Sequence, residues 1–533
     1  MHICDISRRS HEKADMTLQN LPIGIQDFEK IRKEGYLYVD KTEQIWRLTH
    51  TGCYYFLSRP RRFGKSLLIS TIKAYYQGKR ELFDGLYIAT QEKEWKQYPV
   101  LHLDLNTNKY DSKEVLETKL GESLSIWEDQ YDCKRPDLPF GMRFENVIRS
   151  AYEKTGRRVV ILVDEYDKPL LQAIGSPELQ EEYRSTLKAF YGALKSGDAS
   201  IQFAMLTGVT KFGKVSVFSD LNNLKDISID ARYYDICGIS EKELLDNFSS
   251  NIDALAEKYA QTREQCIDTL RRRYDGYHFH HATPGMYNPF SLLNTFDSLE
   301  FGSYWFETGT PTYLVQLLQE HEYNLEEMAS ADVTADVINS VDIASSDPIP
   351  VIYQSGYLTI KEYDQEFDTY LLGFPNKEVE EGFVKYLLPW YSDRMDGGRS
   401  AFDVRQFVND VREGNVEQFL GRLRSLFADT PYELIRNLEN HYQNVLWILY
   451  KLCGFYTQAE YHTSEGRIDL CVQTPKYCYV MEFKLDGTAE EALEQISEKN
   501  YTLPFEQNGQ QIYRIGMNFS KESRNIERWV VER

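Results

Sequence analysis

The chain has 533 residues, of which 42% are hydrophobic and 27% charged, a balance that is ordinary for folded soluble proteins and excludes a chain that is disordered throughout. At roughly 100 to 200 residues per domain, this length predicts several domains. The formal net charge of −21 excludes a chain-wide basic surface of the kind that drives non-specific nucleic-acid binding, so any contact with DNA or RNA must be local.

The cysteines and the N-terminal residues bear on the cellular compartment. The 8 cysteines form no CxxC pair and no disulfide framework, which predicts free thiols in a reducing compartment. Residues 1–20 carry charges where a signal peptide needs an apolar stretch, and no apolar run approaches the roughly 18 residues that span a bilayer. We therefore expect a cytoplasmic protein with a short N-terminal leader over 1–20 and no membrane partner.

Strands alternate with helical patterns in the first half of the chain. Runs of β-branched and aromatic residues occur at 53–58, 100–106, 158–165 and 201–208. Such alternation predicts a parallel sheet with helices on both faces, with ligands bound at the carboxyl ends of the strands. We expect this α/β domain over 21–235.

The sequence RPRRFGKSLL, 59–68, directly follows the first of these strands and is close to the phosphate-loop pattern G-x-x-x-x-G-K-[ST], although Arg59 replaces its first glycine. In such a loop, backbone N–H groups point at a phosphate, Lys65 reaches the β and γ oxygens, and Ser66 offers a hydroxyl to Mg²⁺. Pro60 is expected to shape the turn, with the arginines beside the phosphates. The alternative is an arginine-rich turn that contains GKS by chance.

Paired acids end the strand VVILVDEYD. In an ATPase, Asp164 would hold Mg²⁺ through water and Glu165 would polarise the attacking water, whereas the alternative is a solvated acidic turn. The next strand end, MLTGVT, offers Thr207 as the polar residue that senses the γ-phosphate, with Thr210 as a rival.

Several stretches carry a family resemblance. They are LPIGIQDFEKIRKEGYLYVDKT, RPRRFGKSLL, VDEYDKPL, LTGVTKFGKVSVFSDLNNL, YNPFSLLN and YWFETGTPTYL. Together they resemble the AAA-ATPase-like family of bacterial proteins with a second, nuclease-like domain at the C-terminus, in which RPRRFGKS is the usual form of the loop. The resemblance covers nearly the whole chain from about residue 21 and implies ATP and Mg²⁺ as ligands. The further residues that it would place at the nucleotide are Arg61, Arg62, Phe63, Gly64, Leu67, Asp40, Lys41 and Thr42.

ATPase cores of this kind often assemble into rings in which a neighbouring subunit supplies an arginine. The chain is therefore a candidate homo-oligomer. Arg61, Arg62 and Arg232 are equal candidates for that arginine.

The middle of the chain changes character. From 236 to 345 the pattern is helical, and ISEKELLDNF opens on the capping-box spacing of Ser240 and Glu243. Residues 347–383 then give two alternating runs around a polar turn, followed by a helix start. We expect a helical domain over 236–345 and a winged-helix-like and helical linker over 346–430.

The last segment, 431–533, is expected to form a small α/β domain of helix, hairpin-like strands, helix and final strand. Glu482 and Lys484 are two residues apart in a strand and face the same side. Asp469 precedes them, so two carboxylates would hold one or two divalent metals that activate water, while the lysine polarises the nucleophile. The alternative for Glu482 and Lys484 is a surface pair.

GRID, VMEFK and the helix that follows them resemble the PD-(D/E)XK nuclease fold. The resemblance implies that Gln495 faces back toward the strands. It also implies a further acid from an upstream helix, for which Glu439 is the candidate and Glu460 a rival.

The charge of this last segment leaves two functions open. Residues 431–533 contain 11 Lys and Arg against 15 Asp and Glu, although a nuclease needs positive charge to meet phosphates. One hypothesis is an Mg²⁺-dependent ATPase coupled to a nuclease that acts on DNA or RNA. The alternative is a nucleotide-switched regulatory module whose nuclease-like domain is inactive.

Overall fold

The computed structural model forms two compact units. The described residues are 19–211, 223–307, 314, 317–318, 323–339, 347–391, 397–428, 438–452, 454, 456–458, 461–463 and 466–533. The first unit contains the described residues up to Trp305 together with Gln354–Gly356, and the second contains Phe306–Tyr353 and Tyr357–Arg533. The domain boundaries expected from the sequence, at 20, 235, 345 and 430, remain predictions.

A five-stranded parallel sheet is the centre of the first unit. Its strand order is β2-β3-β4-β1-β5. The strands are β1 (Tyr54–Ser58), β2 (Val100–Asp104), β3 (Val159–Asp164), β4 (Ile201–Gly208) and β5 (Lys225–Asp226). The four strands expected from the sequence are confirmed, whereas the two-residue β5 was not expected. Because β4 lies between β1 and β3, the carboxyl end of β4 separates the phosphate loop from the paired acids.

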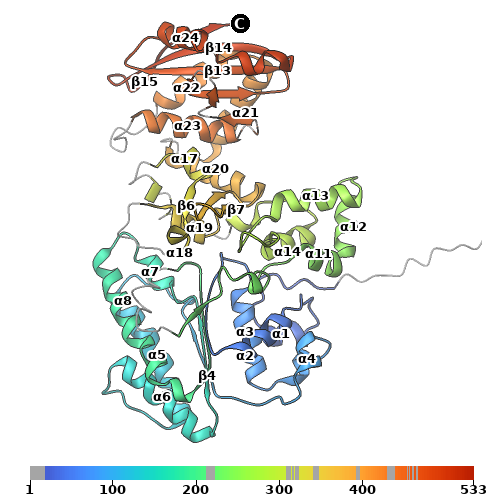
Figure 1. Ribbon diagram of the computed structural model, residues 1–533, viewed down its shortest axis with the longest axis vertical. Helices are drawn as coiled ribbons and strands as arrows, with labels where there is room; N and C mark the ends of the chain where they lie inside the picture. Colours follow the sequence, from blue (N-terminus) through green and yellow to red (C-terminus); the bar gives the residue numbers. More distant parts are fainter. Residues whose placement is uncertain are drawn as a thin grey trace, which may run out of the picture. The chain divides into compact units, whose positions relative to one another are not determined.

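Helices cover both faces of this sheet, as expected (Figure 1). One face carries α1 (Phe28–Lys33), α2 (Thr42–Thr51), α3 (Lys65–Tyr76) and α4 (Tyr87–Gln91), and the other carries α5 (Lys113–Tyr131), α6 (Phe140–Thr155) and α8 (Pro177–Tyr191). Every residue of β1 and of β3 is buried. Continuous apolar runs such as YYFL and VVILV therefore form strands that are covered on both sides.

A helical layer completes the first unit. It contains α11 (Glu241–Asn247), α12 (Ser249–Lys258), α13 (Arg263–Tyr274) and α14 (Pro289–Ser298). The capping box of Ser240 and Glu243 at the start of α11 is confirmed. Leu244, Phe248 and Ile252 share one hydrophobic core with Leu37, so the N-terminal segment packs against this layer.

The second unit begins with a small antiparallel sheet. The expected hairpin is confirmed as β7 (Thr359–Asp364) and β8 (Thr369–Gly373). A third strand, β6 (Asp332–Thr334), pairs with β8 and was not expected, because three residues are too few to give an alternating pattern. The helices of this region are α17 (Leu325–Ala329), α18 (Ala335–Asn339), α19 (Ile349–Gln354), α20 (Lys377–Tyr391), α21 (Gly397–Glu413), α22 (Val416–Ala428) and α23 (Leu438–Leu452).

A mixed five-stranded sheet forms the C-terminal part of the second unit, in the order β15-β14-β13-β12-β9. Its strands are β9 (Tyr456–Gln458), β12 (Leu470–Gln473), β13 (Tyr477–Leu485), β14 (Gln511–Ser520) and β15 (Asn525–Glu532). The parallel strands β13 and β14 are joined through α24 (Ala489–Glu498), which lies on the opposite side of the sheet from α23 (Figure 1). Two short strands precede β12 in the chain: β10 (Tyr461–Thr463) pairs with β11 (Gly466–Ile468).

In the part of the chain that the structure describes, no helix could cross a membrane. Each helix there is too short or too polar to traverse a lipid bilayer.

Replacing Gly516 by alanine is expected to weaken the second unit. A Cβ atom at Gly516 would lie 2.1 Å from the carbonyl oxygen of Ala489 and 2.6 Å from the backbone nitrogen of Leu493, so α24 would have to move off β14. We expect a loss of about 1–3 kcal/mol in the free energy of unfolding, measured from the urea transition of this unit. Gly421→Ala is the control, since a Cβ there meets none of the described residues within 4 Å and lies inside α22. Equal stabilities of the two variants would contradict this packing.

Candidate nucleotide site and candidate nuclease site

The loop between β1 and α3 turns sharply at two residues. Arg62 has φ 65° and Gly64 has φ 92°, both in the left-handed region, and Gly64 precedes the first residue of α3, Lys65. The left-handed conformation suits glycine because it has no Cβ. The turn places the amino end of α3, with its free N–H groups, at the carboxyl edge of the sheet, where an anion is stabilised.

Lys65 joins this loop to the acids at the end of β3. Its side chain is 3% exposed, and its Nζ lies 3.2 Å from Glu165 Oε1. The same ammonium donates to the carbonyl oxygens of Arg59 (3.1 Å) and Pro60 (3.2 Å). The lysine of the expected phosphate loop and the second acid of VDEYD therefore lie in contact, although they are 100 positions apart in the sequence.

Asp164 is buried beside two hydroxyl groups. Thr207 Oγ1 donates to Asp164 Oδ1 at 2.6 Å, and the Ser66 hydroxyl also forms a hydrogen bond with this carboxylate. Burial and the neighbouring charge of Glu165 raise the pKa of Asp164, while the bonds from Ser66 and Thr207 and the charge of Lys65 act in the opposite direction. Carboxylate and hydroxyl oxygens are suitable ligands for Mg²⁺, directly or through water.

Glu165 has an unusual backbone conformation. Its φ of 56° lies in the left-handed region, which costs a non-glycine residue on the order of 1–3 kcal/mol. The conformation brings its side chain to Lys65, while the next residue, Tyr166, is fully buried and donates its backbone N–H to the Thr207 carbonyl at 2.9 Å. The backbone strain is thus located at Glu165, the residue that the sequence predicts to polarise the attacking water.

The two threonines considered for the γ-phosphate have different partners. Thr207 bonds Asp164, whereas Thr210 donates both its backbone N–H (2.6 Å) and its hydroxyl (2.8 Å) to Asp167. Asp167 is fully buried, and a Cβ at Gly208 would lie 2.6 Å from its Oδ1. The sequence analysis missed Asp167, although it is the last acid of VDEYD. Asp167 therefore binds the backbone N–H groups of the segment that follows β4.

The side chain of Arg59 is bound to other partners, and the expectation that it lies beside the phosphates is wrong for this residue. Its guanidinium is 1% exposed and donates to the carbonyl oxygens of Ser228 (2.6 Å) and Tyr233 (3.1 Å). It also lies 3.9 Å from the centre of the Phe279 ring. Arg59 therefore fixes the loop to the segment after β5. Arg62 lies 4.9 Å from the Phe290 ring centre.

An apolar cavity adjoins the amino end of α3. Its lining includes Leu37, Val39, Phe63, Leu67, Ile236 and Phe248, together with Gly64 and Lys41. The Lys41 ammonium is paired with Glu243 at 2.7 Å. Asp40 and Thr42 are not part of this lining. Asp40 accepts the backbone N–H of Tyr87, and Thr42 accepts that of Ile88, so both hold the start of α4.

Lys168 is a further cation that the sequence analysis missed. Its Nζ donates to the backbone and side-chain oxygens of Asn106. Burial and the charge of Arg61 lower its pKa, and the charge of Glu165 raises it. Lys65 contacts Glu165, and the charge of Lys168 interacts with those of Glu165 and Arg61, a charge distribution that suits a polyanion. Lys168 could have been found from the sequence, because it follows Glu165, the second acid of the pair, by three residues.

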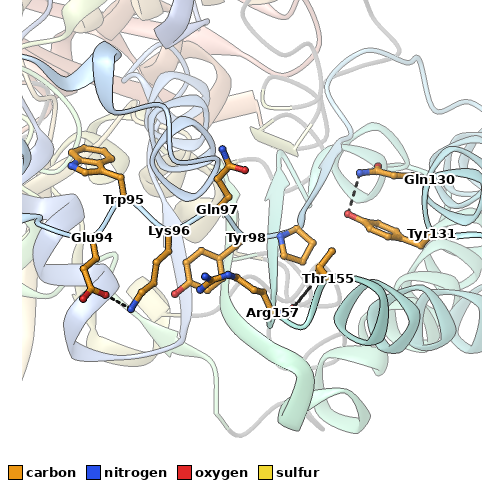
Figure 2. Close-up of a pocket in the computed structure, with 10 residues that line it drawn as sticks. Glu94, Trp95, Lys96, Gln97, Tyr98, Gln130, Tyr131, Thr155 and Arg157 are labelled. Atoms are coloured by element: carbon orange, nitrogen blue, oxygen red, sulfur yellow. Dashed lines mark hydrogen bonds and ion pairs between the residues drawn. The ribbon is translucent and has the colours of Figure 1, made fainter.

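A wide surface cavity of about 820 Å³ lies elsewhere on the first unit, near the start of β2 and β3 (Figure 2). Figure 2 shows that several of its polar side chains bond one another. Glu94 pairs with Lys96, and Gln130 donates to the hydroxyl of Tyr131. The cavity contains none of the predicted site residues, and ligands of parallel sheets bind at the opposite ends of the strands.

Four of the predicted nuclease residues meet in the second unit. Asp469 Oδ2 accepts the backbone N–H of Phe483 at 2.9 Å, which ties it to β13. Gln495 of α24 donates to Glu482 Oε1 and accepts from Lys484 Nζ. Lys484 Nζ also lies 3.6 Å from Glu482 Oε1. Gln495 thus faces back toward the strands. Glu439 lies in α23 with its side chain outside the description, and Glu460 lies outside the described residues.

Tyr501 is a residue of this cluster that the sequence did not single out. Its hydroxyl accepts from Gln495 Nε2 at 3.3 Å. Since the same amide nitrogen donates to Glu482, Tyr501 helps to fix which end of the Gln495 amide faces the carboxylate.

Glu482 has the features of a metal ligand. It is 3% exposed, and its Oε2 has no hydrogen-bond partner among the residues that the structure describes. Burial and the charge of Asp469 raise its pKa to about 7, against the opposite effect of Lys484. A buried carboxylate oxygen without a donor fits a divalent cation, and Mg²⁺ is often held by only one or two carboxylates. No cluster of three or more His, Cys, Asp or Glu side chains that could hold a metal occurs among the residues that the structure describes.

The comparisons with known proteins agree with the two predicted domains. A family model described as "Predicted AAA-ATPase" matches residues 22–218, and one described as "PD-(D/E)XK nuclease superfamily" matches residues 437–529. The chain is 36% identical over 528 residues to the "Uncharacterized protein in vnfD 5'region" of Azotobacter chroococcum mcd 1, a match that covers 97% of this chain and 99% of that protein. The chain belongs to the family of AAA-ATPase-like proteins with a C-terminal PD-(D/E)XK nuclease superfamily domain, as the sequence predicted.

The affinity of the second site for Mn²⁺ is expected to depend on pH. Below the pKa of Glu482, about 7, a metal must displace a proton from this carboxyl, so affinity should rise by up to about tenfold per pH unit and level off above about pH 7. Titration calorimetry of the full chain without nucleotide measures this. Glu482→Gln should bind weakly with no such slope. Equal wild-type affinities at about pH 5.5 and pH 7.5 would contradict the assignment.

Proposed function

We propose that the first unit binds and hydrolyses ATP with Mg²⁺, and that the second unit is a metal-dependent nuclease whose action is coupled to the nucleotide. One observation carries the first part of the proposal. Lys65 and Ser66 from the amino end of α3 meet Glu165 and Asp164 from the end of β3 at a single edge of the sheet. These are the side-chain types that phosphoryl transfer from ATP requires.

Each residue has a distinct role in the proposed hydrolysis. Lys65 turns its ammonium from the loop carbonyls to the β and γ oxygens, and Arg61 and Lys168 add positive charge near the transferred group. Ser66 and Asp164 would hold Mg²⁺, which would supply positive charge against the charge that develops on the phosphates. Glu165 orients the attacking water. Thr207 holds Asp164 through its 2.6 Å hydrogen bond.

The apolar cavity beside Gly64 and Leu67 is the proposed site of the base. It adjoins the loop at Phe63 and Gly64 and is lined by apolar residues from the N-terminal segment and the helical layer. A flat purine ring fits such a lining, because small-molecule sites are mainly hydrophobic with few polar groups. The expected roles of Asp40 and Thr42 are therefore indirect, through the position of α4.

In the second unit, Asp469 and Glu482 would hold the divalent cation that activates water against a phosphodiester. Lys484 would polarise the nucleophile, and Gln495 would position both Lys484 and Glu482. Glu439 remains the proposed further acid. DNA or RNA is the proposed substrate, and the acidic balance of residues 431–533 implies that the remaining chain or a second copy supplies positive charge. A homo-oligomer in the cytoplasm is the setting that we propose.

The alternative, a nucleotide switch with an inactive nuclease-like domain, is favoured by one observation. Residues 431–533 carry more acidic than basic side chains, whereas a nuclease needs positive charge to meet phosphates. The two hypotheses differ in whether a phosphodiester is cut.

Lys65→Ala and Glu165→Gln are expected to affect ATP differently. Lys65→Ala removes the ammonium that grips the phosphates and should lower ATP affinity by about 100-fold, the scale of a lost charged hydrogen bond. Glu165→Gln should keep binding and lower turnover by about 10²–10⁴-fold, since it loses only the base. Calorimetry and phosphate release measure the two effects. Lys73→Ala, on the same helix, is the control. Normal hydrolysis by Glu165→Gln would contradict the assigned role.

Asp469→Asn and Lys484→Ala are expected to abolish metal-dependent cleavage of a mixed DNA and RNA substrate. Turnover should fall by at least about 100-fold, because each variant removes a group that acts on the phosphodiester. Lys476→Ala is the matched control, since it removes an exposed lysine from the neighbouring β12–β13 turn. Cleavage by none of these proteins, the wild type included, would favour the nucleotide switch.

A further inference from the structure

Gln354–Gly356 belongs to the first unit although the chain on both sides of it belongs to the second. The segment connects the end of α19 to β7, which begins at Thr359. Gln354 and Ser355 are only 6% and 4% exposed. Connecting turns normally lie on the surface, because buried backbone polar groups need partners. A turn that is buried in this way has specific contacts that hold it.

Gln354 holds the chain where it leaves β4. Its Oε1 accepts the backbone N–H of Lys211 at 2.6 Å. The two preceding N–H groups, those of Val209 and Thr210, donate to Asp167. Three consecutive backbone donors after β4 are therefore held by two buried side chains, one of which comes from this segment. The strand that they fix carries Thr207, the partner of Asp164.

Gly356 contacts the phosphate loop. A Cβ atom at Gly356 would lie 2.6 Å from Pro60 Cβ and 2.7 Å from Pro60 Cγ, and its φ of +91° is itself left-handed. The carbonyl of Pro60 accepts Lys65 Nζ. The segment therefore lies against the loop on one side and against the exit of β4 on the other.

We propose that Gln354–Gly356 transmits the state of the phosphate loop along the chain to α19 and β7. The inference rests on the proposed nucleotide site and goes beyond it by identifying the segment that carries the signal. When a triphosphate attracts Lys65, the hydrogen bond from its Nζ to the carbonyl of Pro60 breaks. The loop then moves toward Gly356, which Pro60 already contacts. The shift moves the residues on which α19 ends and from which β7 begins.

Hydrogen–deuterium exchange of the full chain tests this proposal, with Mg²⁺ and a non-hydrolysable ATP analogue at saturation. In the wild type, the analogue should slow exchange in residues 59–66 and also in residues 349–364. Gly356→Ala displaces the segment from Pro60, and Gln354→Met removes the acceptor for Lys211. In both variants the loop should stay protected, while the change in 349–364 falls by about half or more, since local opening there becomes independent of the loop.

Gly175→Ala is the matched control, because Gly175 has φ +92° and a Cβ there meets no atom within 4 Å in the part of the chain that the structure describes. It carries the same backbone strain as Gly356→Ala without the contact, so its response should equal that of the wild type. Protection of 59–66 without any change in 349–364 in the wild type would overturn this inference alone. An unaltered response in both Gly356→Ala and Gln354→Met, or an equal loss in Gly175→Ala, would also overturn it. No binding of the analogue by the wild type would overturn the proposed nucleotide site itself.

Discussion

The contact between Lys65 and Glu165 is the interaction on which the first unit depends. A nearly buried ammonium has to be compensated, because removing a charge from water costs several kcal/mol by general estimates. Lys65 is compensated by one carboxylate and by the carbonyls of its own loop. That arrangement requires β4 to lie between β1 and β3, so that the loop and the acids face each other across the Thr207 end of β4. The sheet order thus determines the site.

The two sites have a similar arrangement of charged side chains. In each, a lysine lies beside a pair of carboxylates of which one is buried, and a neutral polar side chain bonds the buried one: Thr207 bonds Asp164, and Gln495 bonds both Glu482 and Lys484. Burial raises the pKa of Asp164 and of Glu482, so both carboxylates hold their protons more strongly than in water. A divalent cation would relieve this cost by favouring the charged form.

The sequence predicted the features that depend on local patterns and missed those that depend on distant contacts. Apolar runs identified β1 to β4, and two-residue spacing brought Glu482 and Lys484 to one face. Arg59 was misjudged because its partners, Ser228 and Tyr233, lie about 170 residues away and have no motif. Gln354 is bound to Lys211, 143 positions distant, and could not be found from its surroundings in the chain. Short strands such as β5 and β6 gave no periodic signal.

Titration calorimetry of the wild-type chain with ATP, in the presence and absence of Mg²⁺, tests the central claim most directly. If Lys65, Ser66, Asp164 and Glu165 surround one triphosphate, ATP binds saturably and Mg²⁺ tightens the binding, because Ser66 and Asp164 act through the metal. The absence of any saturable heat with Mg²⁺ and ATP would contradict the claim.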